Sequence, residues 1–266
     1  MKTFILSLPT QFPTVVSTNI RSFFSVLRLK YGTYVAEAEL SPPADVRIWE
    51  EQGVCTVATK EGSFQTESPL TDFDRYLFEH PTYAPSVLAL HGAAVEWRGE
   101  AYLFLAATTS GKTTLTSYLT SCGFGYLTDD CILLDRSTFC VHPYTTPIQL
   151  RDGGREVLQA YRAEPDGLQL LEESGAQRRW VYTPENSIET AIPLRKIFFL
   201  ERTEDENGSI GMSATERIAA LMKSPITHYP VTGDYLRLLT RLAKTDCYIL
   251  RYCDMRYVKE LIERDG

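Results

Sequence analysis

Residues 101–115 read AYLFLAATTSGKTTL, and this stretch decides the fold. The apolar run at its start, residues 101–107, predicts a buried strand, and a loop of threonine, serine and glycine follows it. From Lys112 to about Ser121 the pattern predicts a helix, with Gly123 as its end. A strand, a loop and a helix in this order are typical of an α/β domain.

The loop carries most of a phosphate-binding pattern. Residues 106–113 match G-x-x-x-x-G-K-[ST] at Gly111, Lys112 and Thr113, with Ala106 in place of the first glycine. Backbone N–H groups at a helix N-terminus concentrate partial positive charge, Lys112 can reach phosphate oxygens, and the Thr113 hydroxyl can bind Mg²⁺. If the position of Ala106 requires a positive φ, alanine there costs about 1 kcal/mol. The alternative is a Ser/Thr-rich turn that precedes a helix by chance.

Two adjacent carboxylates, Asp129 and Asp130, precede the apolar run 131–134. Carboxylates beside buried strand residues are costly unless a cation compensates them, and Mg²⁺ held with a nucleotide would do so. The alternative is a pair of aspartates that cap a turn. The phosphate-binding pattern upstream favours the first interpretation, in which the two aspartates bind a metal ion. His91 lies on a predicted strand, where it either has a structural role or relays a proton near the carboxylates.

The remaining pattern predicts two parts, residues 1–84 and 85–266. The first is a small α+β unit with helices at 19–31 and 71–80 and strands at 4–8, 34–40, 46–49, 54–59 and 63–67. The second has strands at 87–97, 101–107, 126–135, 196–201 and 247–252, and further helices at 151–161, 215–223, 234–244 and 255–264. Residues 168–186 are expected to form an irregular loop. The fold class is α/β with a mixed (α+β) sheet. The alternative to two separate parts is that residues 1–84 are an extension of one sheet that continues into residues 85–266.

Composition narrows the class of protein further. The chain has 266 residues, a net charge of −7 and 44% hydrophobic residues, which excludes a disordered chain and disfavours binding to nucleic acid or anionic lipid. The longest apolar run, residues 101–107, is too short to cross a membrane. The N-terminus has no signal-peptide pattern, and six cysteines without a C-x-x-C pair indicate reduced thiols. We therefore expect a cytoplasmic protein with no membrane or nucleic-acid partner, and leave self-association open.

Several motifs in a fixed order resemble the catalytic domain of HPr kinase/phosphorylase. The matching segments are Leu90-His91-Gly92, an apolar hairpin, Ser110-Gly111-Lys112-Thr113-Thr114-Leu115, Gly123-Phe124 and Tyr126-Leu127-Thr128-Asp129-Asp130. The loop is also similar to that of phosphoenolpyruvate carboxykinases, which share this P-loop core. The close match covers about Val87–Asp135, with looser similarity over residues 147–151 and 192–200.

This resemblance implies ATP and Mg²⁺ as cofactors and assigns the site. The implied nucleotide contacts are Thr108, Thr109, Ser110, Gly111, Lys112, Thr113 and Thr114. The implied catalytic residues are His91, Lys112, Asp129 and Asp130. The aspartates divide metal binding and activation of the acceptor hydroxyl, and Thr113 and Asp130 are the expected metal ligands. Arg151 matches an arginine that could contact phosphate or substrate, with an ordinary surface arginine as the alternative.

The departures refine the expected function. Thr114 stands where HPr kinases usually carry an acidic residue, and we find no glycine-rich segment of the kind associated with the reverse reaction. These features favour compact HPr-kinase-like proteins, some of which phosphorylate a peptide hydroxyl in peptide-modification pathways. The sequence therefore predicts a Mg²⁺-dependent kinase for a serine or threonine hydroxyl of a peptide or protein, such as a precursor peptide.

Three alternatives use the same loop: a kinase for a small hydroxylated metabolite, a nucleotide-binding regulator without transfer, and a carboxykinase. The short chain disfavours the carboxykinase. Further candidate substrate contacts are the pair Arg151 and Arg155 and the cluster Arg178-Arg179-Trp180, although we expect Arg178 and Arg179 to be solvated loop charges.

Overall fold

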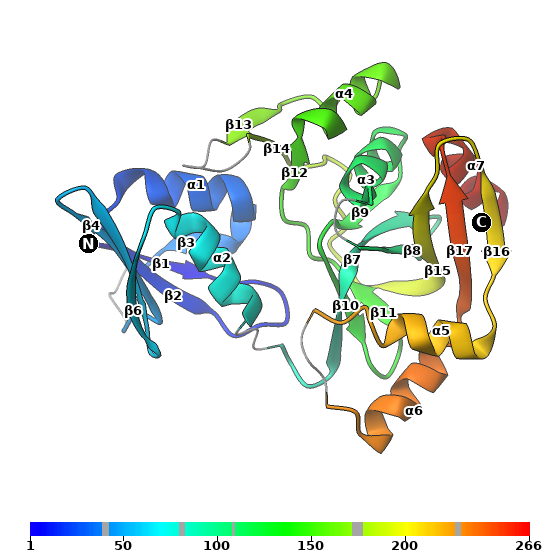
Figure 1. Ribbon diagram of the computed structural model, residues 1–266, viewed down its shortest axis with the longest axis horizontal. Coiled ribbons are helices and arrows are strands. Elements are labelled where there is room, and N and C mark those ends of the chain that lie inside the picture. Colours follow the sequence, from blue (N-terminus) through cyan, green and yellow to red (C-terminus); the bar gives the residue numbers. More distant parts are fainter. Residues whose placement is uncertain (39–42, 80–82, 108–109, 172–177, 227–229) are drawn as a thin grey trace.

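The computed structural model describes residues 1–38, 43–79, 83–107, 110–171, 178–226 and 230–266 (Figure 1). Within these ranges, a mixed eight-stranded sheet has the order β11-β10-β7-β8-β15-β17-β16, with β9 beside β7. Its strands are β7 (Val87–Trp97), β8 (Glu100–Leu105), β9 (Gly125–Thr128), β10 (Cys131–Asp135), β11 (Cys140–His142), β15 (Ile192–Arg202), β16 (Gly208–Gly211) and β17 (Asp246–Tyr252). The predicted mixed α+β class is confirmed, whereas the P-loop core and the division at residue 84 stay predictions.

Helices cover both faces of this sheet. Helices α3 (Lys112–Ser121) and α7 (Met255–Asp265) pack on one face, and α5 (Ala214–Leu221) and α6 (Gly233–Leu242) on the other. Side chains of β8 alternate between the two cores: Tyr102 and Phe104 join the α3 side, and Leu103 and Leu105 the α5 side. A strand buried on both faces is apolar throughout, which explains the uninterrupted run at residues 101–105.

Three parallel strands bring distant residues to one edge of the sheet. Strand β15 pairs in parallel with both β8 and β17. The loop after β8 therefore leaves the same edge at which Arg202 ends β15 and Tyr252 ends β17. Since α3 begins directly after that loop, its N-terminus lies at this edge, where open α/β sheets commonly bind ligands.

The expected single strand at 126–135 is wrong, because two strands occupy this segment. Strand β9 pairs with Ala94–Glu96 of β7, whereas β10 pairs with Val87–His91 of the same strand. Between them the Thr128 hydroxyl donates to the Cys131 carbonyl at 3.0 Å and accepts from the Cys131 amide at 3.3 Å, which closes a turn. Asp129 and Asp130 occupy this turn.

The irregular loop expected at 168–186 is also wrong. Strands β13 (Gln169–Leu171) and β14 (Arg179–Tyr182) form a three-stranded sheet with β12 (Ile148–Arg151), in the order β12-β14-β13. Residues 172–177 lie outside the described part of the chain. Helix α4 (Asp152–Ala160) follows β12 directly. This small sheet places both Arg151 and Arg179 beside the start of α3.

The N-terminal unit is a six-stranded sheet with two helices. Its strands β1 (Lys2–Leu6), β2 (Thr14–Thr18), β3 (Val35–Glu37), β4 (Val46–Glu51), β5 (Val54–Thr59) and β6 (Gly62–Thr66) have the order β3-β1-β2-β4-β5-β6. Helices α1 (Arg21–Tyr31) and α2 (Pro69–Glu79) pack on this sheet, with the short 3₁₀ helix η1 (Gly32–Tyr34) after α1. Their core continues into Ala89 of β7 and Leu133 of β10, so the unit packs against the larger part.

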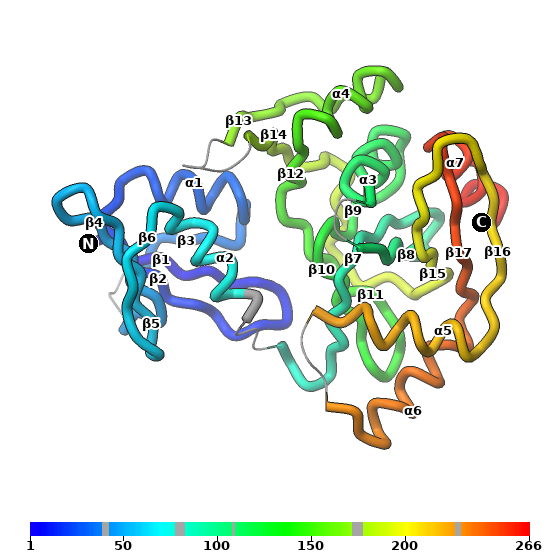
Figure 2. Tube along the Cα trace, viewed as in Figure 1, coloured from blue at the N-terminus to red at the C-terminus, as the bar shows by residue number. Residues whose placement is uncertain are grey.

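The two ends of the chain lie at opposite ends of the long axis (Figure 2). All six cysteines lie in described segments, and none of them forms a disulfide. No helix in the described ranges is both long and apolar enough to span a lipid bilayer.

Candidate active site

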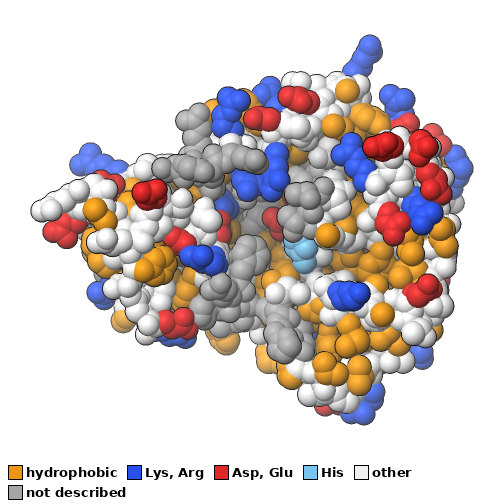
Figure 3. Space-filling model, viewed as in Figure 1, with side chains coloured by type: hydrophobic (Ala, Val, Ile, Leu, Met, Phe, Trp, Pro, Cys, Tyr) orange, Lys and Arg blue, Asp and Glu red, His pale blue; other side chains and the backbone are white. Residues whose placement is uncertain are grey.

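A cleft of about 690 Å³ lies at the N-terminus of α3, and we call it the α3 cleft. Its lining includes eight of the predicted site residues: His91, Gly111, Lys112, Thr113, Thr114, Asp129, Asp130 and Arg151. Ser110 does not line it, and the buried Ser110 hydroxyl has no hydrogen-bond partner among the described residues. Thr108 and Thr109 lie outside those residues. Figure 3 shows the surface hollowed in this region, with basic side chains near the upper rim.

The first turn of α3 presents backbone donors to the cleft. Gly111 precedes the helix with φ 91°, and a Cβ there would lie 3.0 Å from the Tyr252 hydroxyl. The first helical bond runs from the Leu115 amide to the Gly111 carbonyl at 2.9 Å, so the amides before it have no partner within the helix. No acidic residue occupies this turn. The positive end of the helix is therefore available to an anion. Ala106 does not have a positive φ, so the strain considered for alanine is absent.

Lys112 is held against the loop. The residue is 6% exposed, and its ammonium donates to the carbonyls of Ala106 at 2.9 Å and Ala107 at 3.0 Å. A lysine has three N–H donors, so one remains for a ligand. Burial lowers the pKa of Lys112, while the charges of Asp130 and Asp129 act in the opposite direction.

Asp129 is a buried carboxyl that lacks a full set of partners. It is 5% exposed, and its buried Oδ1 has no hydrogen-bond partner among the described residues. Burial raises the pKa of Asp129 to about 8, the charge of Asp130 adds to this, and Thr113 and Lys112 act against it. A divalent cation would supply the missing partner, and oxygen ligands from carboxylates and a hydroxyl suit Mg²⁺. The residues present therefore fit the metal that the sequence predicts. Three or more His, Cys, Asp or Glu side chains grouped for a metal are not found in the described ranges.

Asp130 differs from its neighbour because it is exposed to the cleft. His91 lies beside it, since Gly92 donates to the Asp130 carbonyl at 3.3 Å. Burial and the charge of Lys112 lower the pKa of His91, although Asp130 opposes them. The buried Nε2 of His91 has no partner within the described chain. Gly92 has no room for a side chain, because a Cβ would lie 2.7 Å from the Phe104 carbonyl oxygen.

Arginines from two elements border the cleft. Arg151 and Arg179 are paired across β12 and β14, and both line the cleft. Arg179 belongs to a strand and is half-buried, so its expected place in a solvated loop is wrong. Arg178 instead pairs with Asp152 at 3.5 Å. Arg155 lies over the Trp180 ring at 4.0 Å, and it does not line the cleft.

Sequence reasoning missed three residues of the cleft region: Gln149, Arg202 and Tyr252. Gln149 and Arg202 line the cleft, and the Tyr252 hydroxyl lies 3.5 Å from the Ser110 carbonyl oxygen. The parallel arrangement of β8, β15 and β17 would have identified the last two, because parallel strands end at one edge. The sequence alone did not show that these strands are neighbours.

Comparisons with known proteins give a structural similarity and no sequence match. No model of a protein family matches the sequence, and no curated protein matches it. Among solved structures, the Hpr(Ser) kinase/phosphatase from Coxiella burnetii is similar over 66% of this chain and 91% of that chain, with 11% sequence identity and a TM-score of 0.33. Membership of the family that the motifs indicated therefore stays a prediction, and the function must be argued from this chain's own geometry.

Proposed function

We propose that the protein is a Mg²⁺-dependent kinase that transfers the γ-phosphoryl group of ATP to a serine or threonine hydroxyl of a peptide or protein. One observation carries the proposal: Lys112, the first turn of α3 and the pair Asp129 and Asp130 line one cleft. Positive groups that bind phosphates and carboxylates that bind a metal or a proton are the parts that phosphoryl transfer requires.

The chain divides these tasks among its residues. The amides of the first turn of α3 bind phosphate oxygens, and Lys112 gives its third N–H to the same group. Thr113 and the unpartnered oxygen of the neighbouring Asp129 would hold the metal ion, which leaves Asp130 for the proton. When bound, Mg²⁺ neutralises charge on the phosphates.

Asp130 is the better base of the pair because it is exposed to the cleft, whereas burial favours the neutral form of Asp129. Asp130 accepts the proton of the acceptor hydroxyl as that oxygen forms its bond to the γ-phosphorus. The bond to the bridging oxygen breaks, and ADP leaves with the electron pair. Catalysis therefore depends on positioning the reacting groups and neutralising charge more than on the strength of the base.

The variant Asp130→Asn tests this assignment. It should bind a fluorescent ATP analogue within about threefold of the wild type but transfer phosphate at least about 100-fold more slowly, because a positioned base contributes about that much. Asp205→Asn changes an exposed aspartate in the turn after β15 and is the matched control.

The contrary results are distinct. A wild-type protein that binds the nucleotide but phosphorylates no acceptor, with Asp130→Asn identical to it, would indicate a regulator without transfer. A protein that binds no nucleotide at all would refute the site itself.

A further inference from the structure

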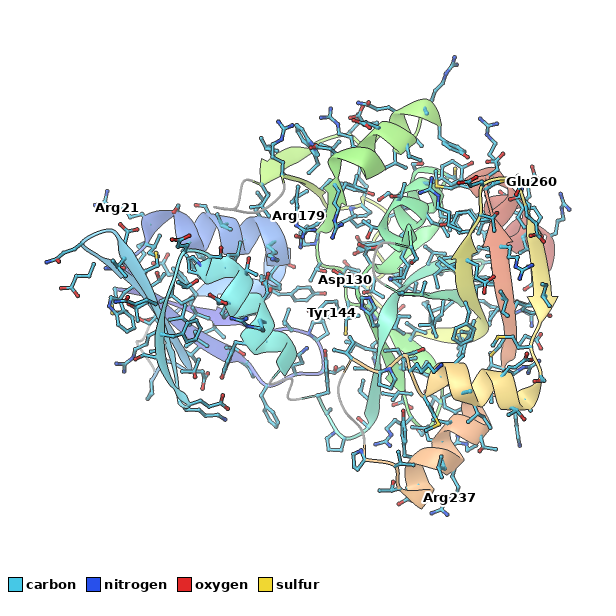
Figure 4. All side chains as sticks on the ribbon, viewed as in Figure 1. Arg21, Asp130, Tyr144, Arg179, Arg237 and Glu260 are labelled. Atoms are coloured by element: carbon cyan, nitrogen blue, oxygen red, sulfur yellow. The ribbon has the colours of Figure 1, made fainter. Side chains whose placement is uncertain are left out.

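A second cavity adjoins the α3 cleft. It has a volume of about 210 Å³, and Asp130, Gln149 and Arg179 line both spaces. Figure 4 shows Arg179, Asp130 and Tyr144 in succession between α1 and β7. A molecule in the second cavity would therefore lie against Asp130, next to the α3 cleft.

The N-terminal unit supplies about half of the walls. From this unit come Leu8, Gln11, Lys30, Tyr31, Asp74, Leu77 and Tyr83, and from the rest of the chain come Cys131, Tyr144 and Thr146. The cavity is thus closed on one side by α1 and α2. Without the N-terminal unit, Asp130 would face open solvent on that side.

The walls are held in place by contacts between elements. The Tyr31 hydroxyl donates to Asp74, and Lys30 forms an ion pair with the same carboxylate, which joins α1 to α2. Across to the larger part, the Tyr34 ring stacks on Tyr144 with centroids 6.1 Å apart. The Tyr34 hydroxyl also accepts from the amide of Thr145 at 3.2 Å. These contacts fix the shape of the cavity before any ligand arrives.

The size and lining restrict the ligand. A water molecule occupies about 30 Å³ of liquid, so the cavity has room for roughly seven groups the size of a water molecule. This is about the space that one small amino acid needs. Leucine and tyrosine side chains provide apolar contact, while Asp130, Gln149 and Arg179 provide polar groups where the cavity adjoins the α3 cleft. A folded domain cannot enter, but one amino-acid-sized group that carries a hydroxyl can.

We infer that this second cavity, the acceptor cavity, binds the hydroxyl-bearing, amino-acid-sized group that receives the phosphate. The N-terminal unit, whose role the sequence left open, thereby selects the acceptor. This inference rests on the proposed kinase function, because it gives Asp130 an acceptor to deprotonate. The group is a free hydroxyamino acid or a residue of a peptide, which share this chemistry.

Leu77 on α2 provides the test, since it lines the acceptor cavity and not the α3 cleft. Leu77→Trp should fill the cavity and lower kcat/KM for the acceptor at least about 10-fold. The affinity for a fluorescent ATP analogue should stay within about twofold, because the nucleotide residues are untouched. Leu236→Trp makes the same change at a leucine on α6 that is 41% exposed, and it should have no effect.

A second variant guards against loss of folding in the first. Leu77→Ala enlarges the cavity, so the ratio of kcat/KM for threonine to that for serine should rise about 10-fold, as expected when a pocket gains room for a methyl group. A purely structural role for Leu77 would lower both values together and leave the ratio unchanged.

The acceptors are free L-serine and L-threonine in one arm, and random peptide pools with serine or threonine fixed at the centre or at an end in the other. The arm in which the wild type is active identifies the source of the group. Wild-type kcat/KM and an unchanged threonine-to-serine ratio in both Leu77 variants would overturn the inference and leave the kinase function standing. A wild type that transfers phosphate in neither arm would overturn both.

Discussion

Asp129 and Asp130 are neighbours in the chain, yet Asp129 is 5% exposed and Asp130 is exposed to the cleft. The turn between β9 and β10 produces this difference, because it directs one side chain inward and the other outward. Two carboxyls with unlike surroundings can take unlike roles in one reaction. The buried one is the stronger candidate for holding a proton until a cation displaces it.

The first prediction concerns stability against pH. Burial raises the pKa of Asp129 to about 8, above its value of about 4 in an unfolded chain. The folded state then binds a proton that the unfolded state releases. The stabilisation is fully present below about pH 4 and is lost as the pH rises through about 8, with a slope of at most about 1.4 kcal/mol per pH unit.

Asp129→Asn removes this slope, so its free energy of unfolding should fall less than that of the wild type between pH 5 and pH 8. Denaturant unfolding at several pH values measures the difference. Asp166→Asn, at an exposed aspartate, should keep the wild-type slope. Parallel curves for Asp129→Asn and the wild type would show that Asp129 is ionised throughout this range.

The second prediction concerns Lys112. Replacing it with alanine removes the ammonium that donates to the loop carbonyls and faces the cleft. Hydrogen bonds to charged groups contribute about 1.5–3 kcal/mol, so ATP affinity should fall about 10–100-fold. Titration with a fluorescent ATP analogue measures this loss. Lys60→Ala at an exposed turn is the control, and equal affinity in both variants would contradict a phosphate contact for Lys112.

The sequence predicted local features of the fold more fully than pairings between distant segments. The helix predicted from Lys112 to Ser121 agrees with α3, and the hairpin predicted between the strands at 87–97 and 101–107 is formed by β7 and β8, with Arg98 and Gly99 between them. Both depend on signals within a few residues: a glycine stop in one case and a tight hairpin turn in the other.

The missed elements depend on distant partners. Strand β16 is exposed and short, and only its antiparallel pairing with β17 defines it. Strand β14 is defined by pairing with β12 and β13, so Arg179 could not be placed in the cleft from its sequence neighbours. The candidate site was predictable where it lies on one motif, and unpredictable where separate strands end together.

The third prediction concerns the space beside Gly111. Gly111→Ala combines a positive φ of 91° with a Cβ 3.0 Å from the Tyr252 hydroxyl. Gly99→Ala is the matched control, since its φ is 83° and nothing lies within 4 Å of its Cβ. Both variants should lose about 1 kcal/mol of stability through backbone strain.

Only Gly111→Ala should lose nucleotide affinity, because only at Gly111 does the added Cβ crowd a neighbouring atom and force the loop to move. Adding Tyr252→Phe to Gly111→Ala should restore part of that affinity by removing the crowding oxygen. Thermal unfolding and nucleotide titration separate the two effects. Equal nucleotide affinity for Gly111→Ala and Gly99→Ala would show that the close approach at Gly111 has no functional consequence.

The fourth prediction concerns His91 and its charged neighbour. Burial is the main cause that lowers the pKa of His91 below 6.5, and the positive charge of Lys112 is the next. The lowered pKa favours the neutral imidazole, which can accept a hydrogen bond through one ring nitrogen. Lys112→Met removes the second cause but keeps the burial, so the pKa of His91 should rise while staying below that of an exposed histidine. An NMR titration of the His91 ring protons measures it, with Lys60→Met as a control that leaves the midpoint unchanged. An unchanged midpoint in Lys112→Met would show that the charge of Lys112 does not act on His91.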